Sequence, residues 1–130
     1  MLFFGHKFLE SPKFYHVFDI DTILTTPPAS TIYLEFQEGN LDIINYLKEN
    51  AITFALKVEN ITEVAYANAL GAAYIIVETA LAKTAQKIAE NYLFDAKILV
   101  VIEEESEIEE LVLLGVDGVV FPEAVVRVSP

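Results

Sequence analysis

Short apolar runs alternate with amphipathic segments along the whole chain. Residues 74–77 and 98–102 are apolar at every position, which is typical of strands that are buried on both faces. Parallel sheets bury both faces of their strands, whereas antiparallel sheets commonly leave one face in water. The pattern therefore predicts a mostly parallel sheet, with strands at residues 14–18, 31–36, 52–58, 73–77, 97–102 and 117–121.

Helices are predicted between these strands, because the intervening segments begin with residues that cap helices and several end at glycine. Short polar side chains accept hydrogen bonds from the free amides of the first turn, and glycine adopts the left-handed conformation that ends a helix. The predicted N-caps are Asp19 or Asp21 for a short turn, Asn40, Thr79, and Ser106, which forms a capping-box pattern with Glu109. The predicted stops are Gly71 and Gly115.

One helix–strand unit occurs twice in the sequence. Residues 59–77 and 103–121 align without gaps at a distance of 44 positions. The identical pairs are Glu59/Glu103, Glu63/Glu107, Leu70/Leu114 and Gly71/Gly115. Each copy reads as a polar turn, a helix, a glycine stop and a buried strand, so the repeat predicts an α/β fold built from βα units.

Two arrangements of these units are compatible with the pattern. In the first, the strands keep sequential order and curl into a half-barrel with helices on one face, as right-handed crossovers allow. An arc of six strands cannot close an eight-stranded barrel, so this arrangement would need a partner to cover its inner face. The alternative is a flavodoxin-like doubly wound sheet with helices on both faces. In either case we expect residues 1–130 to form a single α/β domain.

Charge and composition narrow the range of partners. The net charge is −12, from 20 acidic and 8 basic residues, and Arg127 is the only arginine. This balance argues against nucleic acid and anionic membranes, which are bound by clusters of lysine and arginine. The absence of cysteine excludes disulfides and thiolate metal sites. Without an apolar run long enough to span a membrane or a signal pattern, we expect a cytoplasmic protein, and we expect no cofactor.

A family resemblance is carried by residues 115–126. The sequence G-V-D-G-V-V-F-P-E-A-V-V resembles the G-A-D-G-V-V-V-G-S-A-I-V signature of phosphate-binding (β/α)8 barrels such as tryptophan synthase α subunits. The resemblance extends over roughly the second half of the chain and implies a barrel-like fold. The Gly-Ser pair that binds phosphate in that family is replaced by Pro122 and Glu123. Proline lacks the amide donor and glutamate repels anions, so we do not expect phosphate binding.

Candidate site residues lie where the predicted strands end, since sites in parallel α/β folds are at the carboxyl ends of strands. An acidic residue closes nearly every strand, and these acids could hold Mg²⁺ or Ca²⁺ only if several converge. No metal ligand set is predicted with confidence. The catalytic candidates are Lys57 with Glu35 or Glu78, and the ligand-binding candidates are Glu59, Glu103 and Glu123. His16 shares strand parity with Phe14 and Phe18, which predicts a histidine packed among aromatic rings.

The sequence does not determine a function. The first hypothesis is a non-catalytic interaction or regulatory protein, because no intact catalytic motif is present. The alternatives are a lyase, isomerase or aldolase that uses Lys57, and a protein that binds a divalent cation or a metabolite of unknown identity. The 54% hydrophobic content predicts a homodimer, and the residues expected at its interface are Phe3, Phe4 and Phe8.

Overall fold

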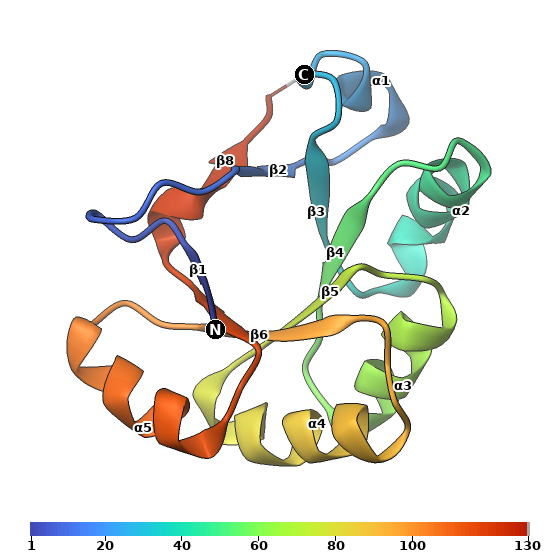
Figure 1. Ribbon diagram of the computed structural model, residues 1–130. Coiled ribbons are helices and arrows are strands. Elements are labelled where there is room, and N and C mark those ends of the chain that lie inside the picture. Colours follow the sequence, from blue (N-terminus) through green and yellow to red (C-terminus); the bar gives the residue numbers. More distant parts are fainter. Residues whose placement is uncertain (130) are drawn as a thin grey trace.

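The computed structural model describes residues 1–129, over which eight strands form one sheet in the order β1-β7-β6-β5-β4-β3-β2-β8. Every neighbouring pair is parallel. The strands lie around a ring and the helices surround it, so the sheet is strongly curled (Figure 1). The predicted α/β class and half-barrel-like parallel sheet are confirmed.

Strands and helices alternate through the central part of the chain. The strands are β1 (Leu2–Phe4), β2 (Phe14–His16), β3 (Thr31–Glu35), β4 (Phe54–Lys57), β5 (Tyr74–Val77), β6 (Lys97–Val101), β7 (Gly118–Val120) and β8 (Val125–Arg127). The α-helices are α1 (Ile20–Ile23), α2 (Leu41–Glu49), α3 (Ile61–Ala69), α4 (Thr79–Asn91) and α5 (Ile108–Leu114). Short 3-10 turns are η1 (Glu38–Asn40), η2 (Glu105–Glu107) and η3 (Pro122–Ala124).

The doubly wound alternative is wrong for this chain. From β2 to β7 each strand pairs with its successor, so the strand order never reverses. Successive right-handed crossovers in one direction place all helices on the same face of a sheet. Figure 1 shows α2, α3, α4 and α5 on the outside of the ring, and no switch point exists between β2 and β7.

Two strands of the sheet escape sequence-based prediction. β1 pairs with β7, with Leu2 opposite Gly118, and β8 pairs with β2, with Val125 opposite Phe14. Each of these edge strands has only three residues, which is too short for a recognisable hydrophobic period. Both are therefore defined by long-range pairing, and they extend the predicted six strands to eight.

The inner face of the curled sheet is filled by its own side chains. It holds a cluster of buried residues, Phe4, Phe14, Ala55, Ile76, Leu99, Val120 and Ala124. The ring of Phe4 lies 4.9 Å from that of Phe14 and 5.6 Å from that of Tyr74, measured between centroids. The expectation that a partner must cover this face is wrong, because β1 and β8 contribute the missing side chains. Phe4 is likewise part of the core and not of a surface.

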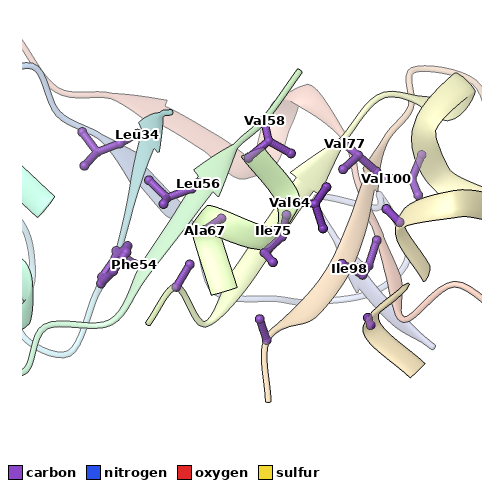
Figure 2. Close-up of a cluster of buried hydrophobic side chains, with 14 of the residues drawn as sticks. Leu34, Phe54, Leu56, Val58, Val64, Ala67, Ile75, Val77, Ile98 and Val100 are labelled. Carbon is purple, nitrogen blue, oxygen red and sulfur yellow. The ribbon is translucent and has the colours of Figure 1, made fainter. Parts of the chain in front are cut away.

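A second, larger core lies between the outer face of the sheet and the helices. Figure 2 shows its central part, in which Leu56 and Val58 pack with Val64 and Ala67 of α3. The outward residues alternate with the inward ones along each strand, as the pleat requires. Of the residues predicted for the core, Val77, Leu99 and Val119 are fully buried, whereas Val101 is half-buried.

Several helix boundaries differ from the predicted caps. The side chain of Asp19 caps α1 as predicted, by accepting from Thr22 N. The N-cap of α4 is Glu78, so Thr79 is the first helical residue. The capping box before α5 is formed by Glu104 and Glu107 and not by Ser106. The N-cap of α4 therefore lies one residue earlier than predicted, and the capping box before α5 begins two residues earlier.

Candidate functional site

The inward positions near the carboxyl ends of the strands bring several predicted site residues together. Tyr33 and Glu35 alternate with buried outward residues on β3, and Lys57 lies beside Glu35 in the register of β3 and β4. Glu78 follows the last residue of β5. Parallel barrels carry their sites at this end, because the loops that follow the strands meet there.

Lys57 is the centre of the first group of side chains at this end. Its Nζ lies 3.1 Å from Glu59 Oε1 and 3.3 Å from Glu78 Oε1. The Lys57 side chain is 10% exposed, whereas those of Glu59 and Glu78 are 70% and 62% exposed. We call Lys57, Glu59 and Glu78 the lysine cluster. Glu35 is exposed and forms no ion pair within residues 1–129, so only Glu78 of the two predicted carboxylate partners reaches Lys57.

Electrostatics at this end affect the phenol of Tyr33. Burial raises its pKa to about 12, and the negative charges of Glu35, Glu78 and Glu59 add to the effect. Both causes act in the same direction, since desolvation and nearby carboxylates each disfavour a phenolate. The Tyr33 hydroxyl therefore keeps its proton at neutral pH and can donate a hydrogen bond to a ligand.

His16 lies among aromatic rings, as predicted. Its ring centroid is 4.3 Å from that of Phe18 and 4.8 Å from that of Tyr33. Burial lowers the pKa of His16, the nearby Glu35 opposes that effect, and Arg127 reinforces it. The Arg127 guanidinium also lies 4.5 Å from the Phe18 ring centroid. Burial therefore favours the neutral imidazole, which packs against the rings of Phe18 and Tyr33.

A cleft opens at the carboxyl ends of β1, β6 and β7, and no residue of the lysine cluster lines it. It has a volume of about 1150 Å³ and lies between residues 5–13 and residues 103–106. Of the predicted ligand-binding residues, Glu103 and Glu123 line this cleft, whereas Glu59 belongs to the lysine cluster. The acids that close the strands therefore divide into two groups and do not converge on one point. Within residues 1–129, no three histidine or acidic side chains are placed to hold a metal ion.

Residues 5–13, which we call the strap, cross the cleft and are fixed mainly through His6. Nε2 of His6 lies 3.0 Å from Glu105 Oε1, and its Nδ1 accepts a hydrogen bond from Phe8 N at 3.1 Å. The His6 ring also contacts Phe121, at 5.5 Å between centroids. At the far end of the strap, Lys13 Nζ donates to the carbonyl of Glu123 at 3.0 Å.

Sequence reasoning assigned Phe8 of the strap to a dimer interface and did not identify the strap as part of a site. His6 has no metal-ligand spacing, and its position at the end of a strand was not visible because β1 was not predicted. The one available signal was Gly5, which adopts a φ of +82° directly after β1. A glycine that follows a short apolar run marks a strand end, and the polar residues after it would then belong to the carboxyl-end loops.

The replacement of Gly-Ser by Pro122 and Glu123 has a structural counterpart. These residues form η3 with Ala124, and Ala124 N is already bonded to the carbonyl of Phe121. The proline has no amide to offer and that of Ala124 is used, so the arrangement differs from a turn whose free amides bind an anion.

The described helices include none that is long and apolar enough to cross a membrane. A comparison with known families finds no matching family model, and a comparison with curated proteins finds no match.

Proposed function

We propose that this protein is a non-catalytic cytoplasmic interaction or regulatory module that binds a small molecule at the carboxyl end of its sheet. The observation that carries the proposal is that the two best candidates for chemistry are already engaged. Lys57 is paired with two carboxylates, and both ring nitrogens of His6 have partners. A nucleophilic amine or a general base needs a free lone pair.

The cleft beside the strap is the binding site in this proposal. It combines a concave surface with cationic, anionic and hydroxyl groups, which come from Lys7, Lys13, Glu103, Ser11 and Ser106. Such a mixture suits a polar metabolite that carries both donors and acceptors. Sugar phosphates are not favoured, because Pro122 has no amide, the amide of Ala124 is bonded to Phe121 O, and the carboxylate of Glu123 repels anions.

A thermal-shift panel tests this proposal. It contains Mg²⁺, Ca²⁺, amino acids, polyamines, neutral sugars and sugar phosphates. A ligand at 100 times its Kd adds roughly 2.7 kcal/mol to the free energy of unfolding. The proposal requires a saturable shift with a polar metabolite that is lost in Glu103→Gln and kept in Glu63→Gln, whose side chain accepts from Glu59 N and does not line the cleft. A panel in which only divalent cations shift the midpoint would contradict it.

Self-association is a separate part of the proposal. Leu93, Leu113, Tyr92 and Phe8 are 85%, 81%, 76% and 76% exposed, which is a large apolar surface for a chain of 130 residues. A homodimer would remove part of this surface from water. Light scattering at micromolar concentration should give twice the mass of 14.5 kDa. A monomer at ~100 µM, far above the Kd of a stable interface, would contradict self-association.

A second candidate is a lyase, isomerase or aldolase that acts through Lys57. It is favoured by the position of Lys57, whose nearly buried side chain lies at the carboxyl end of β4. Such an enzyme would form a Schiff base with a carbonyl substrate. Borohydride reduction in the presence of small aldehydes and ketoses would then add mass at Lys57, detected by peptide mass spectrometry. Labelling of the exposed Lys83 and Lys87 at the same rate would exclude this candidate.

A further inference from the structure

We propose that the strap is a gate: it opens over the cleft by local unfolding, while the sheet beneath stays folded, and the contact of His6 with Glu105 is its latch. Every residue of the strap lines the cleft, so displacement of the strap would expose the whole cavity. This proposal concerns motion alone and holds whichever molecule the cleft takes.

Burial within the strap is concentrated at one side chain. The segment contains no helix or strand, and Lys7, Phe8, Leu9 and Glu10 are exposed. Phe8 is 76% exposed, whereas the His6 side chain is only 11% exposed. Because little apolar surface is removed from water elsewhere in the strap, its opening costs far less free energy than unfolding of the sheet.

The latch joins the strap to the loop that contains η2. Glu105 belongs to η2, and its Oε1 lies 3.0 Å from His6 Nε2 and 3.8 Å from Lys7 Nζ. The Glu105 side chain is 51% exposed, so solvent weakens this interaction and makes it reversible. The strap is therefore held to η2 by a contact of one nearly buried histidine with one half-exposed acid, and this contact can break while the sheet stays folded.

The two ends of the strap are fixed, which makes the motion a hinged one. At one end, Gly5 is so close to Ala124 that an added Cβ would lie 2.7 Å from Ala124 N. At the other end, Lys13 precedes β2 and donates to the carbonyl of Glu123. The strap is anchored where it meets the sheet and free between those points. Figure 1 shows it as the blue loop that joins β1 to β2.

The experiment compares amide exchange in the wild-type chain and in three variants. The strap amides of Phe8 and Leu9, which bond to His6, report opening, and the amide of Val58, bonded to Ile76 O, reports unfolding of the sheet. Glu105→Ala removes the latch acceptor. Glu10→Ala is the control, since it removes the same charge from within the strap without a hydrogen-bond partner in residues 1–129. His6→Phe keeps an aromatic ring but removes the acceptor for Phe8 N and the polar contact with Glu105.

We expect Glu105→Ala to speed exchange of the strap amides about 2- to 10-fold, the range for the loss of one hydrogen bond. His6→Phe should speed exchange of the Leu9 amide by at least as much, and neither variant should change exchange at Val58. Equal rates in Glu105→Ala and Glu10→Ala would overturn the latch. A rise at Val58 that matches the rise in the strap would overturn the gate, because the strap would then open only when the sheet unfolds.

Discussion

Lys57 Nζ and Glu78 Oε1 lie 3.3 Å apart, which joins the ends of the neighbouring strands β4 and β5. The lysine is nearly buried, and the glutamate is mostly exposed. This asymmetry determines what the ion pair can contribute. Pairs with exposed partners contribute little to stability, whereas a buried charge that loses its partners is costly.

We therefore predict an order of effects for the lysine cluster. Lys57→Met should change the free energy of unfolding by about 1 kcal/mol or less, because it removes a buried charge together with weak pairs. The double variant Glu59→Gln/Glu78→Gln should destabilise by more than Lys57→Met, since it leaves the ammonium in place without its carboxylates. Urea unfolding at low salt measures both. If Lys57→Met destabilises the protein more than the double variant does, the prediction is wrong, and the buried ammonium does not depend on its two carboxylates.

Leu99 lies in the inner core and is fully buried. Leu99→Ala should destabilise the protein by about 2–5 kcal/mol, because the closely packed interior cannot collapse around the missing atoms. Leu113 is 81% exposed, so Leu113→Ala is the matched control and should change stability by less than about 0.5 kcal/mol. Equal urea midpoints for the two variants would show that the placement of β6 in the core is wrong.

Gly5 combines a left-handed backbone with close contact to the chain before β8. Gly5→Ala should cost more than about 1 kcal/mol, because alanine is strained at a φ of +82° and its Cβ would meet Ala124 N at 2.7 Å. Gly39 has no atom within 4 Å of an added Cβ, so Gly39→Ala should be nearly neutral. Thermal unfolding of the two variants separates strain at Gly5 from a general effect of alanine.

As the pH falls below about 6.5, the protein should lose stability, in part because of His16. Burial lowers the pKa of this histidine in the folded state, so its neutral form is favoured there. The contribution is complete above the unfolded pKa of about 6.5 and is lost as the pH falls through the lower folded value. His16→Gln should reduce the pH dependence of the urea midpoint between pH 7 and pH 5. An unchanged slope would show that the acidic residues alone account for it.

At high pH the corresponding group is Tyr33. Its pKa is raised to about 12, so the unfolded chain releases this proton first and stability falls as the pH rises from about 10 towards 12. Absorbance at ~295 nm should show one tyrosine that ionises late relative to the usual value near 10. Tyr33→Phe should remove that late component. If the late component persists, another tyrosine is the perturbed one.

The sequence by itself determined the α/β class, the parallel sheet and six of its strands. Those features depend on local patterns: apolar runs such as residues 98–102, the caps before the helices and the glycines that end them. The pairing of Lys57 with Glu78 was also accessible, because residues at the ends of consecutive parallel strands meet at one edge of the sheet.

The tertiary structure alone decided the two edge strands, the filled inner face and the cleft. β1 and β8 are three residues long and exist through pairing with β7 and β2, which are distant in sequence. The contact between His6 and Glu105 likewise joins residues about 100 positions apart in the chain. No local pattern encodes such contacts, since they arise only when the sheet curls and brings its first and last strands to the same place.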